Sequence, residues 1–520
     1  MAAIQILWVD DEIESLQAQI IFLQNKGYEV TPVSNGFDAI EKVQQHFFDA
    51  VLMDESMPGI SGLQTMMRLK EINKLLPVIL ITRNDTESLM DDAIGSEIAD
   101  YLIKPVNPHQ VLLSLKKIID NRRLVAEKTT TQYQQQFASL LQELQQNPDH
   151  QQWMEIYRKL VYWELEMDKS DSPEMRDIFY AQKQEANQAF ARYVCREYVN
   201  WLNPRSLSAP IMSQHLLALK VLPHISAGRP VFFVLIDNLR FDQWKAIEPL
   251  LAESFRVADE DSFYSILPTA TQYARNAIFA GLLPADIQQR FPSLWKNDEE
   301  EGGKNLHEAE LLQEQLKRLR KENLRISYQK ITQFQEGQQL PGQIHNLLQN
   351  DLNVIVYNFV DTLSHARTEM EIMKELASDE TSYRSLTRSW FEHSPLHQAL
   401  KKLADKPVTV ILATDHGSVR VKDAQKVVGD RQTTTNLRYK HGRNLQYNEK
   451  EVLAFTRPQE AGLPVPTVHS SYIFAREDAY FCYPNNFHHY AQLYKNTFQH
   501  GGISLEEMII PVVRLESRVG

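Results

Sequence analysis

Apolar runs of strand length that end in an aspartate recur in two parts of this chain. The runs are IQILWVDD at 4–11, FDAVLMD at 48–54, PVFFVLID at 230–237, LNVIVYNFVD at 352–361 and VTVILATD at 408–415. Such strands, alternating with helical patterns, predict parallel sheets covered by helices. Ligands of these sheets bind at the carboxyl ends of the strands. We therefore expect an α/β multidomain protein with two sheets and a candidate site at each.

Size, charge and cysteine content narrow the class of protein. The 520 residues exceed one ordinary core, so two or three domains are expected. A formal net charge of −12 argues against a general coat for nucleic acid. Cys195 and Cys482 lack metal-type spacing, which suits a reducing compartment. Without a signal-peptide layout, or an apolar run near the ~18 residues of a membrane span, we expect a cytoplasmic protein.

Residues 1–120 predict a doubly wound, flavodoxin-like sheet whose strand ends carry a phosphoryl-transfer site. Asp10, Asp11 and Asp54 place three carboxylates at neighbouring strand ends, where they can bind Mg²⁺. Asp54 can then accept a phosphoryl group, and Lys104 can neutralise its oxygens.

Two further strand-end residues fit a switch in this domain. The Thr82 hydroxyl can bond a phosphoryl oxygen, and Tyr101 is the aromatic side chain that can move inward when Thr82 moves. A lone strand-end aspartate often only caps a helix. Here five strand-end positions are in register, with a DxxMPxxxG spacing from Asp54 to Gly62, and this set favours function: Asp10, Asp11, Asp54, Thr82 and Lys104. This stretch resembles the receiver domain of two-component response regulators.

Residues 121–225 predict a helical-bundle connector. The segment is rich in Gln, Glu, Leu and Tyr, and its apolar residues recur at helical spacing. We interpret its aromatic stripe as core or domain-packing surface: Trp153, Tyr157, Trp163, Tyr198 and Trp201. No basic recognition helix is evident, which disfavours a DNA-binding helix-turn-helix.

Residues 226–520 carry a candidate site for two zinc-like metals. The predicted ligands are Asp237, Asp361, His365, Asp415, His416 and His500. One ion would use Asp361, His365 and His500, and the other would use the remaining three. Imidazole mixed with carboxylate favours zinc over manganese. Two ions ~3.5–4 Å apart can stabilise both oxygens of an in-line phosphoryl displacement. Thr271, in the turn-like LPTAT segment, is the predicted nucleophile, because its weakly nucleophilic hydroxyl gains from a neighbouring metal.

Each of these residues alone also fits a helix cap or an ion pair, and the whole ordered set argues for the site. A local basic run at 419–444 includes Arg438, Lys440, His441 and Arg443. These four could hold the phosphates of a nucleotide or oligonucleotide, or they could form a solvated loop. A charged insertion at 296–345 fits a lid or a dimer contact.

The set in residues 226–520 resembles the alkaline phosphatase superfamily and, within it, PglZ-type domains. The resemblance rests on IDNLRFD at 236–242, LPTATQYARNAIFAG at 267–281, FVDTLSH at 359–365, ATDHGS at 413–418 and HGGISLEEMIIP at 500–511. Related nucleotide phosphodiesterases take their nucleophile from the second threonine of a PTxT turn. The resemblance therefore implies Thr271, with Thr269 as the alternative.

Receiver, connector and PglZ-type domain together resemble PorX-type response regulators. The resemblance implies a sensor histidine kinase as partner and a secretion-motor protein or sigma factor as a further one. It also implies a role in type IX secretion or gliding, and a homodimer on phosphorylation. Its implied activity is a two-zinc phosphodiesterase acting on cyclic or linear oligonucleotides. Two alternatives stay open: an adaptor whose metal domain docks proteins, and a direct transcription factor.

Overall fold

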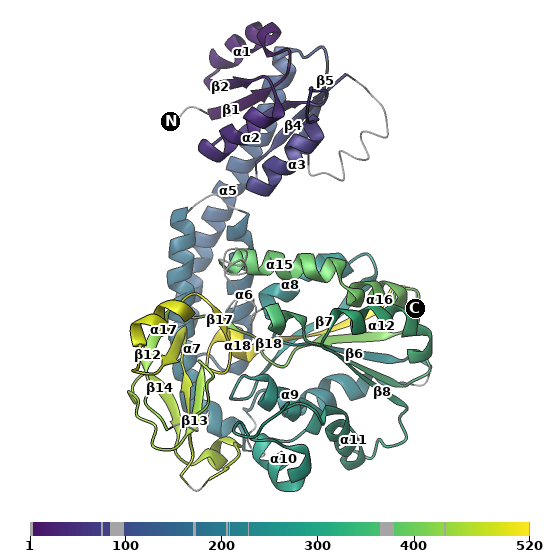
Figure 1. Cartoon of the computed structure of the whole chain (residues 1–520), viewed down its shortest axis with the longest axis vertical. Helices are drawn as coiled ribbons and strands as arrows, with labels where there is room; N and C mark the ends of the chain where they lie inside the picture. The colour runs from purple at the N-terminus through teal and green to yellow at the C-terminus, as the bar shows by residue number, and fades with distance from the viewer. Residues whose placement is uncertain are drawn as a thin grey trace. The chain divides into compact units, whose positions relative to one another are not determined.

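The computed structural model describes residues 4–73, 76–83, 98–169, 173–203, 206, 208–226, 228–363, 379–430, 433–467 and 469–518. By its internal contacts the chain divides into two compact units, Met1–Gln134 and Gln135–Gly520. Each unit contains its own central sheet (Figure 1). The expectation of an α/β multidomain protein is therefore confirmed.

The first unit is built on a five-stranded parallel sheet with the strand order β2-β1-β3-β4-β5. This is the flavodoxin-like order, as predicted. Apolar residues of β1, β3 and β4 are buried because both faces of the sheet are covered by helices. The elements are β1 Ile4–Val9, α1 Gln17–Gln24, β2 Tyr28–Val33, α2 Gly36–Gln45, β3 Ala50–Asp54, α3 Gly62–Ile72, β4 Val78–Thr82 and β5 Asp100–Ile103.

The connector consists of helices, as predicted: α5 Pro108–Gln145, α6 His150–Asp168 and α7 Pro173–Trp201. Helix α6 begins at a capping box in which Asp149 accepts from the backbone N–H of Gln152. Trp163 Nε1 donates to Gln136 Oε1 at 2.9 Å, which ties α6 to the end of α5. The aromatic stripe is buried, so it forms core. Helix α5 runs through residue 120 without a break, and the domain boundaries at 120 and 225 stay predictions.

The second unit contains a six-stranded mixed sheet with the order β7-β18-β10-β6-β9-β8. Four neighbouring strands, β10-β6-β9-β8, are parallel, whereas β18 pairs antiparallel with both β10 and β7. Every residue of β6 and β9 is buried, which fits the continuous apolar sequence of β6 and the mostly apolar sequence of β9, where Asn353 is the exception. The strands are β6 Val231–Ile236, β7 Phe255–Tyr264, β8 Ile326–Ile331, β9 Leu352–Tyr357, β10 Thr409–Ala413 and β18 Ile509–Ser517.

Helices cover both faces of this sheet (Figure 1). One face carries α8 Phe241–Leu251, α12 Phe334–Leu347, α15 Glu380–His393 and α16 Pro395–Leu403. The other carries α9 Thr271–Ala280, α10 Pro284–Arg290 and α11 Glu308–Arg318. The insertion at 296–345 thus supplies α11, α12 and an edge strand of the sheet, β8.

A smaller lobe follows β10 in the chain. Its strands are β11 Val419–Arg420, β12 Asp423–Lys426, β13 Tyr439–Gly442, β14 Val452–Phe455, β15 Ser471–Ala475, β16 Ala479–Cys482 and β17 Phe498–Gln499. Helix α17 Phe487–Tyr494 and the short helix α18 Leu505–Met508 complete it. Among the described residues, no helix combines the length and apolarity that a bilayer crossing requires.

Candidate metal centre and phosphoryl-acceptor site

Three adjacent strands of the larger sheet bring the predicted aspartates to one edge. Strands β10, β6 and β9 are neighbours, and their last residues pair as Ala413 with Leu235 and Ile236 with Tyr357. Asp415, Asp237 and Asp361 follow these strand ends within a few residues. Because the strands are parallel, all three carboxylates reach the same edge.

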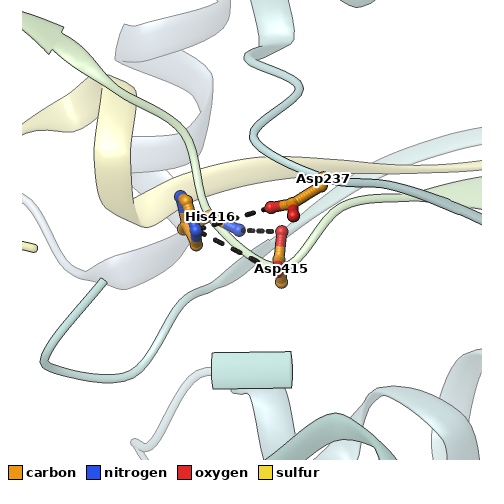
Figure 2. Close-up of side chains that lie close together, drawn as sticks. All are labelled: Asp237, Asp415 and His416. Carbon is orange, nitrogen blue, oxygen red and sulfur yellow. Dashed lines mark hydrogen bonds and ion pairs between the residues drawn. The ribbon is translucent and has the colours of Figure 1, made fainter. Parts of the chain in front are cut away.

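Asp237, Asp415 and His416 lie close together and form the first group of predicted ligands (Figure 2). One potential ligand atom from each lies within 4.8 Å of the others. His416 Nε2 is 3.7 Å from Asp237 Oδ1 and 3.9 Å from Asp415 Oδ2. All three side chains are buried. Adjacent residues point apart in a strand, but the chain leaves strand geometry after Ala413, so Asp415 and His416 reach one point.

The Thr271 hydroxyl lies beside this group. Its Oγ1 is 3.3 Å from Asp237 Oδ1 and 3.0 Å from His416 Nε2. Thr271 is the first residue of α9, where the helix dipole and the free N–H groups favour negative charge. Its side chain is half-buried, whereas Thr269 is fully buried. The Thr269 hydroxyl donates to Gly502 O at 2.9 Å and accepts from Gly501 N at 3.0 Å. Thr269 therefore stabilises the backbone next to His500.

Asp361 and His500 form the second group. His500 Nε2 is 3.5 Å from Asp361 Oδ1, and the His500 and His416 rings stack with centroids 4.2 Å apart. Asn238 connects the groups: its backbone N–H donates to Asp415 Oδ1, and its side-chain amide donates to Asp361 Oδ1. This geometry requires a left-handed backbone at Asn238, with φ 62°. His365, the remaining predicted ligand, lies outside the described residues.

The donors present suit divalent cations. Burial raises the pKa of the Asp237 and Asp415 carboxyls and lowers the pKa of the His416 imidazole. A neutral imidazole keeps a lone pair for a metal, and clustered carboxylates are stabilised by a cation. Asp415 Oδ2 is buried and has no hydrogen-bond partner among the described residues. Carboxylate oxygens with imidazole nitrogens are a donor set that zinc accepts.

The first unit places its acidic residues at the carboxyl edge of its own sheet. Ligand atoms of Asp10, Asp11 and Asp54 lie within 4.8 Å of one another. Lys104 Nζ is 2.9 Å from Asp10 Oδ2 and 3.1 Å from Asp54 Oδ1. Burial raises the pKa of the Asp54 carboxyl, while Lys104 acts in the opposite direction. Three carboxylates beside one ammonium group fit a Mg²⁺ site next to a phosphoryl acceptor.

The backbone approaches Asp54 closely, and the two predicted switch residues differ in exposure. A Cβ on Gly62 would lie 2.1 Å from Asp54 O, so this position requires glycine. The Thr82 hydroxyl donates to Glu55. Tyr101 is 46% exposed, so its ring has room to move.

Family profiles match in three consecutive stretches of the chain. The PglZ profile, described as a BREX system PglZ alkaline phosphatase-like domain, covers residues 216–515, more than half of the chain. The chain belongs to the PglZ family. A PorX response regulator linker domain matches 123–202, and a response regulator receiver domain matches 6–116. The order of receiver, linker and PglZ domain is that of PorX-type response regulators, as predicted.

Curated relatives share only part of their length with this PglZ-family chain. It is 33% identical over 127 residues to the transcriptional regulatory protein ZraR of Klebsiella oxytoca, covering 24% of this chain and 29% of that protein. It is 34% identical over 131 residues to the phosphoglycerate transport system transcriptional regulatory protein PgtA of Salmonella typhimurium, covering 25% and 31%. The chain thus spans about three-tenths of the length of these relatives.

Solved structures that resemble the chain include receiver domains. A CheY-like receiver domain protein from Methanospirillum hungatei JF-1 is 24% identical, with a TM-score of 0.22, covering 23% of this chain and 96% of that one. The chemotaxis protein CheY4 of Vibrio cholerae is 28% identical, with a TM-score of 0.22, covering 22% and 99%.

Arg275 and Glu308 belong to the PglZ site, although the sequence patterns do not single them out. Arg275 Nη1 is 3.0 Å from Asp237 Oδ2, and its Nε is 2.7 Å from Glu308 Oε1 and 3.8 Å from Asp415 Oδ2. Arg275 lies four residues after Thr271 on α9, so helical spacing could have indicated it. Glu308 comes from the insertion, whose place beside the site no local pattern reveals.

The four predicted substrate contacts lie in different environments. The Arg438 guanidinium is buried, donates to both oxygens of Glu507 and to the carbonyl of Ala479, and therefore supports the fold. The substrate role of Arg438 stays a prediction. Lys440 and His441 are also buried, with Lys440 Nζ donating to Thr434 O at 2.9 Å. Arg443 is exposed. For Lys440, His441 and Arg443 the substrate role stays a prediction.

Proposed function

We propose that this response regulator is phosphorylated on Asp54 and that its PglZ domain is a two-zinc phosphodiesterase. The observation that carries the proposal is the Thr271 hydroxyl, 3.0 Å from His416 Nε2 and 3.3 Å from Asp237 Oδ1 at the start of a helix. A nucleophile, a metal-ligand group and a helix N-terminus at one point suit attack on a phosphate ester.

Six residues would hold the zinc ions: Asp237, Asp415 and His416 one, and Asp361, His365 and His500 the other. Zinc would supply Lewis acidity, favouring the ionised hydroxyl and a negatively charged leaving oxygen. The bond from Thr271 Oγ1 to phosphorus forms while the ester P–O bond breaks. The Thr271 hydroxyl proton is released to solvent and the departing alkoxide takes up a proton. Water later cleaves the threonine-bound phosphodiester, which restores the Thr271 hydroxyl and gives a phosphomonoester.

Oligonucleotides are the proposed substrate class, on the strength of the resemblance to PorX-type regulators. The receiver implies a phospho-donor such as a sensor kinase. A secretion-motor or sigma-factor partner, a role in type IX secretion, dimerisation on phosphorylation and a cytoplasmic location stay predictions of that resemblance.

Hydrolysis of a bis-aryl phosphodiester, beside the matching aryl monoester, tests the activity. We expect zinc-dependent diester cleavage that chelation abolishes and that Thr271→Ala lowers roughly 10⁴-fold or more in kcat. Thr271→Ser, which keeps the hydroxyl, is the matched control and should retain measurable turnover. Full activity of Thr271→Ala would reject the nucleophile. Two bound zinc ions without hydrolysis of either ester would favour the adaptor.

A further inference from the structure

Both segments that carry the histidine ligands are bonded to one residue of the short helix α18. The Glu507 carbonyl accepts from the backbone N–H of Gly417 at 3.2 Å, next to His416. The Glu507 carboxylate accepts from the backbone N–H of Gly502 at 2.9 Å, two residues after His500. The position of α18 therefore constrains the backbone beside both imidazoles.

The backbone packs closely at both of these segments, so neither glycine has room for a side chain. A Cβ on Gly417 would lie 2.0 Å from the Glu506 carbonyl oxygen, and a Cβ on Gly502 would lie 2.4 Å from Ala475 O. Glu507 itself is fully buried and accepts from Arg438 Nη2 at 2.6 Å and from Ser504 Oγ at 2.7 Å. Because the backbones touch directly, a displacement of α18 would displace the segment that carries His416.

The opposite side of α18 is bonded to helix α7 of the linker. The Leu505 N–H donates to Asn187 Oδ1 at 2.8 Å, and Asn187 Nδ2 donates to Glu506 Oε2 at 3.0 Å. Lys183 Nζ is 3.0 Å from Glu506 Oε1 and 2.8 Å from Glu164 Oε2 of α6. These side chains are buried, so the linker supplies both the cation and the amide that satisfy this end of α18.

We infer that Asn187 and Lys183 are positioning residues for the histidine ligands, and that the linker thereby sets the metal affinity of the PglZ domain. The inference rests on the proposed metal site. Groups that orient metal ligands from outside the coordination sphere commonly change metal affinity 10- to 100-fold when they are removed. Here the orienting groups come from the linker, outside the stretch that matches the PglZ profile, although both belong to one compact unit.

Zinc affinity of the full chain, measured by competition with a chromophoric chelator, tests the inference. We expect Asn187→Leu and Lys183→Met each to weaken binding at one or both sites by about 10- to 100-fold. Gln182→Leu is the matched control. Gln182 is buried on the same helix and donates to Phe137 O at 3.1 Å, so its loss removes a hydrogen bond between α7 and α5 and perturbs the linker there. Its zinc affinity should equal that of wild type.

The outcomes separate the inference from the proposed function. Wild type that binds no zinc would reject the proposed metal site, whatever the variants do. Wild type that binds two ions, with folded Asn187→Leu and Lys183→Met equal to it within twofold, would overturn the inference alone. Equal weakening in Gln182→Leu would also overturn it, because a general linker defect would then suffice. Circular dichroism of the zinc-free proteins reports folding. Asn187→Ser makes the same deletion without added bulk if Asn187→Leu misfolds.

Discussion

The two acidic sites of this chain use the same strand-end placement and differ in burial and in their cation. In the receiver, Asp11 is exposed, and the ammonium of Lys104 bridges Asp10 and Asp54. In the PglZ domain, Asp237 and Asp415 are fully buried against the Arg275 guanidinium. Asp10 and Asp54 are buried as well, so the receiver site differs in its one exposed carboxylate, Asp11, and in having a lysine ammonium group in place of an imidazole. Carboxylates beside an ammonium group suit Mg²⁺ and a phosphoryl group, whereas buried carboxylates beside an imidazole suit a resident zinc-like metal.

The largest expected effects come from removing one carboxylate of each site in turn. Asp54→Asn should abolish phosphoryl uptake from acetyl phosphate and keep zinc affinity. Asp237→Asn should keep phosphoryl uptake and lower zinc affinity by more than about 100-fold, since a direct ligand is lost. Intact-protein mass spectrometry and chelator competition measure the two quantities. Loss of phosphoryl uptake in Asp237→Asn would contradict the proposal that the receiver takes up the phosphoryl group independently of the zinc site.

Arg275→Met tests whether the guanidinium group and zinc both compensate the buried negative charge of the PglZ site. We expect it to lower the free energy of unfolding by about 3–5 kcal/mol without zinc, because Asp237 and Glu308 then stay buried without their shared cation. Saturating zinc should reduce that loss by compensating the negative charge. Urea unfolding with chelator and with zinc measures both values. Arg256→Met, at a mostly exposed ion pair with Glu516, is the control and should change stability by less than about 0.5 kcal/mol. An equal loss of unfolding free energy with and without zinc would show that the contribution of Arg275 does not depend on the metal.

Lys440 gives a pH-dependent test. Burial lowers the pKa of its ammonium group to about 8, below the ordinary value of an unfolded chain. The unfolded state therefore binds more protons between about pH 8 and 10.5, so stability from this group rises with pH in that window. Lys440→Met should be more stable than wild type near pH 7, by at most about 3 kcal/mol, and the gap should shrink toward pH 10.

Denaturant unfolding at pH 7 and 9.5 measures this gap. Lys401→Met, at an exposed position of α16, is the control and should show no such pH trend. A gap for Lys440→Met that is constant with pH would mean that the lysine is not held in a pKa-lowering environment.

The smallest expected effect concerns Tyr101, the exposed receiver residue that is predicted to act as a switch. Tyr101→Ala should change the free energy of unfolding by less than about 0.5 kcal/mol, because its side chain is 46% exposed. Ile81→Ala, at a fully buried position of the neighbouring strand β4, should cost roughly 2–4 kcal/mol. Thermal unfolding of the full chain compares them. A large loss for Tyr101→Ala would show that the ring already supports the receiver core.

Site residues that follow strands could be predicted from the sequence, because the ends of parallel strands meet at one edge of the sheet. That reasoning indicated Asp237, Asp361 and Asp415, and the structure brings each to the same edge. It did not indicate the pairing of Arg438 with Glu507, 69 residues apart, or the contact of Glu308 with Arg275. The basic run at 419–444 fits either a phosphate-binding surface or a solvated loop, because charge alone does not reveal burial. Long-range partners of a charged residue are set by tertiary packing, which local patterns do not encode.

The Lys183–Glu506 ion pair indicates that the PglZ domain depends on the linker and cannot be separated from it without loss of contacts. Sequence similarity treats linker and PglZ domain as separate modules, with a junction between residues 202 and 216. The folded chain instead forms one compact unit from Gln135 to Gly520. A chain cut at residue 216 would keep Glu506 and lose the ammonium and amide that satisfy it. A fragment that contains the PglZ domain should therefore include α6 and α7. In a chimeric protein, the junction that keeps the linker and the PglZ domain together lies N-terminal to the linker.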